Sequence, residues 1–352
     1  MKDKRRIKMK ILFSTYSKSF EFKGGGHIIM EKIKEYMQKK GVKVEIKKQN
    51  EAKFKEYDLA HNFDVMKESL PFLEKAKANK KKVAIHPFFT YSFDAAFREK
   101  IPFMQRIKML AYNIVNRYDP FHTSYVRKEM RLADLLFPNS EMEAKIITKD
   151  FGISRKKVCI VPDGVDERFF FANEKEFRKK FGIKEEFVLF VGRIEPRKNI
   201  VRLIKALDGT GIPLVIIGPA DPEKEYFNEC KKIAGTKVRF LGEIPHNSSL
   251  LASAYSAAKV FALPSWDETP GMTALEAGAA GCSVVITERG CTKEYFKDFV
   301  EYVNPESTQE VREKILKQFK AKKTKALSGF IKKNYSWERV AEEVLQAYKR
   351  VL

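Results

Sequence analysis

Two acidic residues with seven residues between them, Glu268 and Glu276, lie on either side of a turn that contains Gly271. The alanine-rich segment after the turn is typical of a helix, and the apolar run 283–286 predicts a strand. A loop at a helix start offers free backbone N–H groups and the positive end of the helix dipole, which together bind phosphate. Carboxylates there would repel phosphate, so we expect them to accept hydrogen bonds from hydroxyl groups. Phosphate and polyol together indicate a nucleotide-sugar ligand.

Two cations, Arg193 and Lys198, occupy a turn about 70 residues upstream. The run 186–192 predicts a buried strand that ends in glycine, as in a parallel sheet, and the apolar spacing of 200–207 predicts a helix. The turn between them therefore lies at the carboxyl edge of the sheet, where open α/β sheets bind ligands. Positive charge at a helix start is unfavourable unless an anion is bound. We expect the two cations to neutralise a diphosphate.

These motifs resemble family 4 of the retaining glycosyltransferases, enzymes of the GT-B fold. The resemblance rests on Gly192, Arg193, Lys198, Pro264, Ser265, Glu268, Glu276 and Gly281, with the segments 133–134, 139–140, 161–166 and 335–338. It covers most of the chain from about residue 130 onward, whereas the preceding residues resemble the family only thinly.

The fold class expected is α/β. A length of 352 residues favours two domains, and short apolar strands alternating with amphipathic helices predict parallel sheets. The resemblance implies two Rossmann-like domains facing across a cleft: residues 1–168 bind the acceptor, 169–335 bind the nucleotide-sugar, and the helix 336–352 crosses back to the first domain. Strands are predicted at 9–14, 42–47, 59–62, 83–86, 135–138, 158–161, 187–191, 213–217, 237–241, 259–263 and 283–287. Helices include 27–39 and 337–352.

The resemblance also implies roles for the donor-binding residues. Glu268 is expected to contact the hydroxyls of the donor sugar, and Glu276 to hold the ribose diol. Backbone N–H groups of Gly271 and Met272 are expected to face the diphosphate or the sugar. Further donor contacts are expected at Thr269 and, through the loop that reaches the base, at Ile244. Without the resemblance, the two glutamates could equally be a surface acid and an ordinary helix-start acid.

In the first domain, the candidates are Gly24, Gly25, Gly26 and His86. The glycines are not spaced as in the dinucleotide fingerprint. They would permit close backbone approach to the diphosphate and sugar, or they are simply a flexible connection. His86 ends a predicted strand, and the resemblance places it beside the reacting sugar as a catalytic residue with Arg193, Lys198 and Glu268. Pro87 follows where family members often have Asp, so an acid–base pair is not implied.

A second histidine, His61, is a weaker candidate for the same cleft, because it also follows a predicted strand. A lone histidine is more often structural. Neither histidine is identified by its spacing alone.

The net charge of +22 is uneven, with 37 Lys or Arg against 22 Asp or Glu in residues 1–168. Such a field attracts nucleotides, anionic lipid or nucleic acid. The segment 101–118 has an apolar helical stripe with cations beside it, typical of a core-packed helix or of a helix on an anionic membrane surface. Four cysteines, Cys159, Cys230, Cys282 and Cys291, show no metal-type spacing and favour a reducing cytoplasm.

The function expected is transfer of a hexosyl group from a nucleoside diphosphate sugar to an acceptor hydroxyl on a glycan or a lipid-linked molecule, with retained anomeric configuration. No cofactor or metal is expected, because the chain has no Asp-x-Asp pair and two fixed cations stand in for a metal. The partners expected are the donor, the acceptor and an anionic membrane surface met by the basic first domain, without specific nucleic acid. Three alternatives stay open: another GT-B enzyme such as a sugar-nucleotide epimerase, a basic nucleic-acid-binding protein, and a non-catalytic relative.

Overall fold

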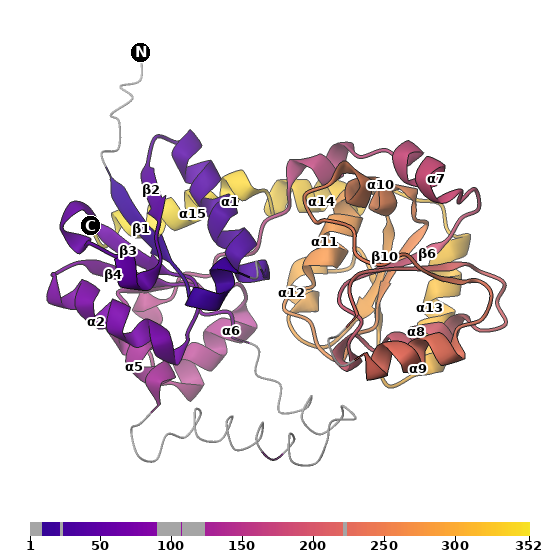
Figure 1. Ribbon diagram of the computed structural model, residues 1–352, viewed down its shortest axis with the longest axis horizontal. Coiled ribbons are helices and arrows are strands. Elements are labelled where there is room, and N and C mark those ends of the chain that lie inside the picture. The colour runs from indigo at the N-terminus through magenta and orange to yellow at the C-terminus, as the bar shows by residue number, and fades with distance from the viewer. Residues whose placement is uncertain (1–8, 22–23, 90–106, 108–123, 221–223) are drawn as a thin grey trace. The chain divides into compact units, whose positions relative to one another are not determined.

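The computed structural model describes residues 9–21, 24–89, 107, 124–220 and 224–352 (Figure 1). The chain divides into two compact units. Unit 1 contains the described residues up to Gly164 together with Trp337–Leu352, and unit 2 contains Val165–Ser336. After Gly164 the chain passes into unit 2, and it returns to unit 1 at Trp337.

Unit 1 is built on a five-stranded parallel sheet in the order β2-β1-β3-β4-β5. Its strands are β1 (Lys10–Ser14), β2 (Lys43–Ile46), β3 (Leu59–Asn62), β4 (Lys82–Ile85) and β5 (Leu135–Leu136). The central strands are buried on both faces, which explains why they read as continuous apolar runs rather than as alternating patterns.

The described helices of unit 1 are α1 (Gly25–Lys39), α2 (Leu70–Ala78), α5 (Tyr125–Leu132), α6 (Glu141–Lys145) and α15 (Trp337–Lys349). Helix α15 buries Val340, Val344 and Tyr348 in the same core as Ile33 of α1. The chain enters α15 beside Gly164, where a Cβ atom would lie 2.5 Å from the Trp337 ring. The carboxyl-terminal helix is thus an integral part of unit 1.

Unit 2 is built on a six-stranded parallel sheet in the order β11-β10-β9-β6-β7-β8. Its strands are β6 (Val188–Val191), β7 (Leu214–Ile217), β8 (Val238–Phe240), β9 (Val260–Leu263), β10 (Ser283–Thr287) and β11 (Glu301–Val303). Its helices are α7 (Lys175–Phe181), α8 (Ile200–Leu207), α9 (Glu225–Ile233), α10 (Ser249–Ala257), α11 (Met272–Ala279), α12 (Thr292–Phe296), α13 (Thr308–Lys320) and α14 (Ala326–Asn334).

The sequence predictions agree with this fold in most elements and fail in two. The strand predicted at 158–161 is wrong: only Val158 forms an isolated bridge to Leu136, because β5 offers just two residues to pair with. Strand β11 was not predicted because only one of its three residues is buried, so no apolar run marks it. The helix predicted at 101–118 lies outside the described residues, except for residue 107. No helix in the described parts of the chain is long and apolar enough to cross a membrane.

Candidate functional site

Arg193, Lys198 and Glu268, three of the residues predicted to bind a nucleotide-sugar, lie in two loops at one edge of the sheet of unit 2. Strands β6 and β9 are parallel neighbours, so the loops that follow them begin side by side. The Trp266 N–H donates to the Arg197 carbonyl oxygen at 2.9 Å, and Arg197 Nη1 donates to the Asp267 carbonyl oxygen at 3.2 Å. These bonds join the Arg193–Lys198 loop to the Glu268 loop, which are 70 residues apart in sequence.

Asn199 fixes the first of these loops, and sequence reasoning did not identify it. It is buried and has a left-handed backbone conformation, with φ of 56°, at the start of α8. Its side-chain amide donates to the carbonyl oxygens of Pro264 at 3.0 Å and Pro305 at 2.8 Å. Asparagine tolerates this backbone region better than most residues do. One side chain therefore sets the turn and ties it to the second loop.

Lys198 and Glu268 form a buried ion pair. The Lys198 Nζ atom lies 2.6 Å from Oε1 of Glu268, and the two side chains are 13% and 6% exposed. Burial alone would raise the pKa of Glu268, but the charges of Lys198 and Arg197 outweigh it and lower this pKa below its usual value. Glu268 is therefore held as a carboxylate that can accept hydrogen bonds.

Arg193 stands in the same loop but projects outward. Its side chain is 68% exposed, and its Nε lies 3.6 Å from Oε2 of Glu195. Glu195 also pairs with Arg197, whose Nε lies 3.4 Å from Oε1 of Glu195. The guanidinium of Arg193 is thus held by a long, solvent-exposed contact, which a ligand could replace at little cost.

Glu276 lies on α11 and is buried by two partners. Its Oε1 lies 2.6 Å from His246 Nε2, and its Oε2 accepts a hydrogen bond from the Tyr255 hydroxyl at 2.9 Å. Burial, with the nearby charge of Glu276, raises the pKa of Tyr255 well above its usual value, so the hydroxyl stays a donor. The sequence analysis assigned no role to His246. The feature that could have indicated one is its position in the loop after β8, two residues beyond Ile244.

The remaining predicted donor residues lie around the start of α11 and in the loop after β8. Gly271 caps α11 with φ of 92°, a conformation that favours glycine, and Met272 is the first helical residue. Thr269 precedes Pro270 in the loop between Glu268 and Gly271. The Ile244 side chain is buried, so the loop offers its backbone rather than that side chain.

A close backbone contact supports the Glu268 loop from the neighbouring strand. Gly290 follows β10 with φ of 82°, and a Cβ atom there would lie 2.0 Å from the carbonyl oxygen of Glu268. The Cys291 N–H donates to that same oxygen at 3.1 Å. The loop of Glu268 is therefore positioned by main-chain contacts that only glycine permits.

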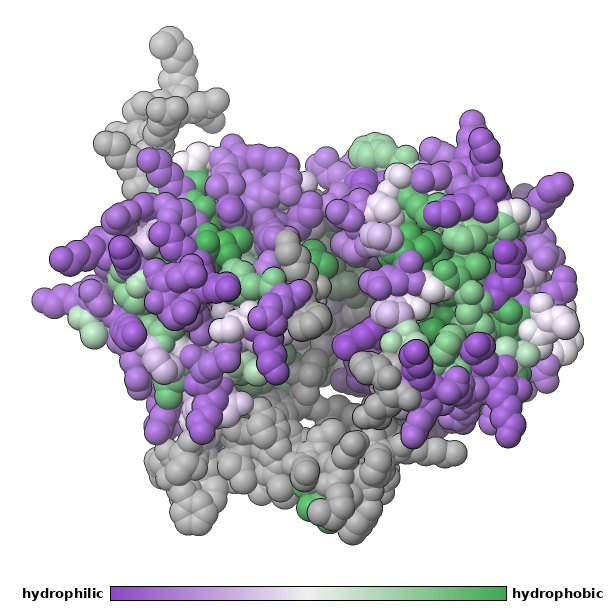
Figure 2. All heavy atoms as spheres, viewed as in Figure 1, coloured by the Kyte–Doolittle hydropathy of each residue, from purple (hydrophilic) through white to green (hydrophobic). Residues whose placement is uncertain are grey.

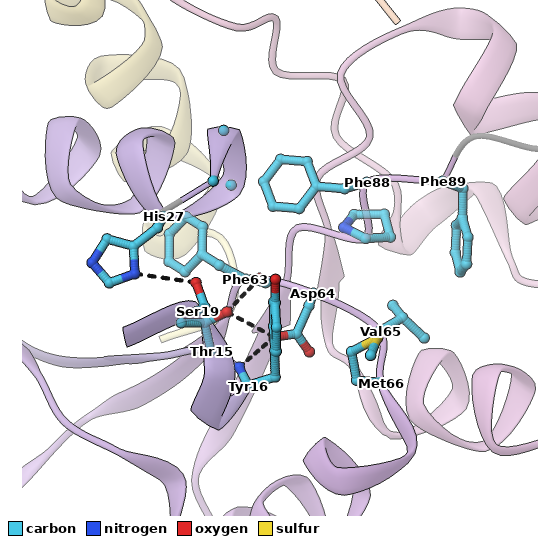
Figure 3. A pocket seen from close by; sticks show the side chains of 14 residues that line it. Thr15, Tyr16, Ser19, His27, Phe63, Asp64, Val65, Met66, Phe88 and Phe89 are labelled. Carbon is cyan, nitrogen blue, oxygen red and sulfur yellow. Dashed lines mark hydrogen bonds between the residues drawn. The ribbon is translucent and has the colours of Figure 1, made fainter. Parts of the chain in front are cut away.

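In unit 1, the three glycines Gly24, Gly25 and Gly26 line a cavity of about 370 Å³ at the carboxyl ends of β1, β3 and β4 (Figure 3). The other lining residues are Thr15, Tyr16, Ser19, His27, Phe63, Asp64, Val65, Met66, Pro87, Phe88 and Phe89. Gly26 approaches Phe88 closely, since a Cβ atom there would lie 3.1 Å from its ring. The glycine segment thus has a defined place at the start of α1.

Asp64 is the buried acid of this cavity, and sequence reasoning missed it. Its Oδ2 accepts hydrogen bonds from the Thr15 hydroxyl at 2.8 Å and the Tyr16 N–H at 2.7 Å, as Figure 3 shows. Its Oδ1 accepts bonds from Asn62 at 3.0 Å and Ser69 at 2.7 Å. Burial raises its pKa despite these donors. The carboxyl group fixes the loop that follows β3.

His86 does not line this cavity. Its Nδ1 lies 2.7 Å from Nε2 of His61, whose Nδ1 lies 2.5 Å from the Tyr348 hydroxyl. Both rings are buried among Phe63 and Phe137, and burial lowers the pKa of His86 to about 3. The two histidines therefore connect β3 and β4 to α15 as neutral core residues. Both rings are buried in this conformation, and the role of His86 beside a reacting sugar stays a prediction.

Residues 173–337 match the family model described as glycosyl transferases group 1. The matched region coincides with most of unit 2, which holds Arg193, Lys198, Glu268 and Glu276.

Curated relatives named glycosyltransferases match part of the chain. An uncharacterized glycosyltransferase of Methanocaldococcus jannaschii is 31% identical over 218 residues, which is 56% of this chain and 55% of that protein. A D-inositol 3-phosphate glycosyltransferase of Actinosynnema mirum is 31% identical over 240 residues, 61% of this chain and 57% of that protein. The chain spans about half the length of the curated relatives it matches.

The fold extends beyond the matched domain. Sucrose-phosphate synthase from Thermosynechococcus elongatus superimposes with a TM-score of 0.73 at 16% identity, covering 97% of this chain and 99% of that one. Anabaena HepE in complex with UDP and glucose gives a TM-score of 0.69 at 16% identity, covering 97% and 100%. Together with the two parallel-sheet units, these similarities show that the chain has the GT-B fold.

Proposed function

We propose that this chain transfers a hexosyl group from a nucleoside diphosphate sugar to an acceptor hydroxyl, with retention of anomeric configuration. The observation that carries the proposal is the 2.6 Å contact between Lys198 and Glu268, which puts a cation and a carboxylate at one point of the sheet edge. A ligand that carries negative charge beside hydroxyl groups would satisfy both. A diphosphate attached to a sugar has this chemistry.

Each of the four charged residues of the site, Arg193, Lys198, Glu268 and Glu276, binds one part of the donor in this proposal. Arg193 and Lys198 neutralise the diphosphate, the first as a planar fork and the second as a point charge. Glu268 accepts hydrogen bonds from sugar hydroxyls, for which its lowered pKa suits it. Glu276 binds the ribose diol, with His246 and Tyr255 holding its carboxylate in place.

In the reaction, the bond between the anomeric carbon and the diphosphate oxygen breaks, and the acceptor oxygen bonds to the same carbon. Negative charge grows on the leaving diphosphate, so Arg193 and Lys198 bind the transition state more tightly than the ground state. The acceptor proton passes to the leaving phosphate oxygen. No protein base is assigned to this step, because His86 is buried and bonded to His61.

Unit 1 supplies the acceptor side in this proposal. Its cavity combines a glycine segment at the start of α1 with aromatic side chains such as Tyr16 and Phe88, surfaces that suit a sugar ring. The acceptor is a glycan or a lipid-linked molecule. We propose the cytoplasm as the compartment, which four cysteines without the spacing of a disulfide framework support. No metal is required, since the two cations supply the positive charge.

A thermal-shift screen against UDP, GDP, ADP and their sugars tests the donor assignment, because a ligand that binds only the folded state raises its stability. We expect one base to raise the melting temperature, with transfer from its sugar unaffected by a chelator. If no nucleotide stabilises the protein, the proposal fails. Donor epimerisation without transfer would favour the epimerase alternative instead, and salt-dependent nucleic-acid binding without nucleotide binding would favour a nucleic-acid-binding protein.

A further inference from the structure

The surface of unit 2 carries an unusually uniform stretch of positive charge around α14. Between Glu313 and Glu338 the chain contains eight lysines and no acidic residue. Hydrophilic side chains cover most of the described surface seen in Figure 2. A stretch of lysines on such a surface is ordinarily a solvated face. What distinguishes α14 is its hydrophobic neighbours.

Two exposed phenylalanines flank this helix. Phe171 is 71% exposed and Phe299 is 43% exposed, and they belong to separate segments of unit 2. Lys332 Nζ lies 5.1 Å from the centre of the Phe171 ring, and the Phe330 ring stacks on Phe299 with ring centres 4.6 Å apart. Residues 330 and 332 are about 200° apart around a helix, so the phenylalanines stand on opposite flanks of its outer side.

The lysines of this helix face solvent. Helix α14 packs on α11 through Leu327 and Ile331, which are buried, while Lys325, Lys332 and Lys333 are exposed. In the described parts of the chain, none of the lysines from 320 to 333 forms an ion pair. We call this surface the α14 face; it comprises Phe171, Phe299, Lys322, Lys323, Lys325, Lys332 and Lys333.

Acidic residues around the α14 face do not balance it. Glu167 and Glu174 precede and follow Phe171, and Asp298 precedes Phe299. Glu174 is engaged by Arg178 Nε at 2.8 Å. The electrostatic potential at the α14 face is therefore positive, and the exposed aromatic side chains belong to the same surface.

We propose that the α14 face docks unit 2 on an anionic lipid surface. Cationic side chains are attracted by the headgroups within about one Debye length, roughly 8 Å at physiological ionic strength. Aromatic side chains at the same level enter the boundary between headgroups and acyl chains. A nucleic acid would use the lysines but would gain little from two phenylalanines that stand apart on separate flanks. The lipid surface uses both features, and this docking does not depend on the transfer reaction.

Co-sedimentation of the full chain with vesicles tests the docking surface. We expect binding to phosphatidylglycerol–phosphatidylcholine vesicles at low salt, and much weaker binding to phosphatidylcholine alone. The double variant Lys332→Glu/Lys333→Glu should reduce vesicle partition by roughly tenfold or more, since each lysine near the surface contributes substantially. The matched control is Lys231→Glu/Lys232→Glu, which makes the same charge change on α9, a helix packed on α8. It should change partition by no more than about twofold.

A hydrophobic probe separates docking from a general charge effect. Phe171→Ser should lower partition several-fold at unchanged charge, and Phe171→Trp should show a blue-shifted emission when anionic vesicles are added. Thermal unfolding confirms that each variant is folded. Absence of vesicle binding, equal losses in the α9 control, or an unshifted emission from the Phe171→Trp variant would overturn the proposal. Binding of RNA that Lys332→Glu/Lys333→Glu abolishes, without vesicle binding, would reassign the face to nucleic acid.

Discussion

The Nζ atom of Lys198 lies 2.6 Å from Oε1 of Glu268, and this contact closes the junction between the loops after β6 and β9. The two groups assigned to the two halves of the donor thus hold each other before a donor arrives. Because Glu268 is buried and the Lys198 side chain is only 13% exposed, removing one partner leaves the other with a poorly compensated charge. A substitution in this pair is therefore expected to change both the stability of the fold and the proposed reaction.

Lys198→Ala should lower kcat by roughly 10²–10³-fold, the range found when one group that stabilises transition-state charge is removed. The pKa of Glu268 should rise, because its main favourable charge is gone. The control is Lys237→Ala, which breaks an exposed ion pair with Glu185 ahead of β8, at the amino edge of the same sheet. Steady-state kinetics with the identified donor gives the comparison. Equal losses in the two variants would remove Lys198 from the reaction.

The sequence was sufficient to predict the positions of these two loops, because strands of a buried parallel sheet can be recognised as short apolar runs. Once β6 and β9 are recognised, their following loops must lie at one edge, and Lys198 and Glu268 come together. The partners His246 and Asn199 could not be found this way. Each acts through a contact 30 or more residues distant in sequence, made by a loop whose course no local pattern encodes.

Glu276→Ala should weaken binding of the nucleoside diphosphate by about tenfold or more, since the ribose loses a charged acceptor worth about 1.5–3 kcal/mol. His246→Ala should weaken it less, because Tyr255 still holds the carboxylate at 2.9 Å. Isothermal titration measures both, with the exposed Glu185→Ala as the control for loss of a carboxylate. If His246→Ala has the larger effect, the histidine rather than the glutamate contacts the nucleotide.

Gly290→Ala should impair donor binding, and Gly281→Ala should not. Both glycines have positive φ, 82° and 89°, so the backbone strain of the substitution is similar. At Gly290 the new Cβ would meet the Glu268 carbonyl oxygen at 2.0 Å, whereas at Gly281 nothing lies within 4 Å. The comparison isolates displacement of the Glu268 loop. Similar nucleotide affinities in the two variants would show that the position of this loop does not matter for the donor.

Asp163→Asn should flatten the pH dependence of stability. Burial raises the pKa of Asp163 to about 7, so between pH 4 and 7 the unfolded chain has released this proton and the folded chain has not. Stability therefore falls as pH rises through this window, by up to about 1.4 kcal/mol per pH unit, and levels off above it. Urea unfolding at pH 5 and pH 7 should show a difference about 2 kcal/mol smaller in the variant. The exposed Asp208→Asn should keep the wild-type difference; a variant at Asp163 that also keeps it would refute the buried titration.

The surroundings of His86 could not be predicted from the sequence. A histidine at the end of a parallel strand can point into the ligand edge or into the layer below, and the alternation of the strand does not decide between them. Here Tyr348, from the far end of the chain, supplies a hydrogen-bonding partner for His61 and closes the core around both rings. The carboxyl-terminal helix thus decides the environment of a residue about 260 positions earlier.

The structure of the protein with its preferred nucleoside diphosphate bound tests the central claim most directly. The account predicts the diphosphate within hydrogen-bond distance of Arg193 and Lys198, and the ribose hydroxyls on the carboxylate of Glu276. A nucleotide bound elsewhere, with Lys198 still closed on Glu268 and Glu276 still turned to His246 and Tyr255 alone, would contradict it.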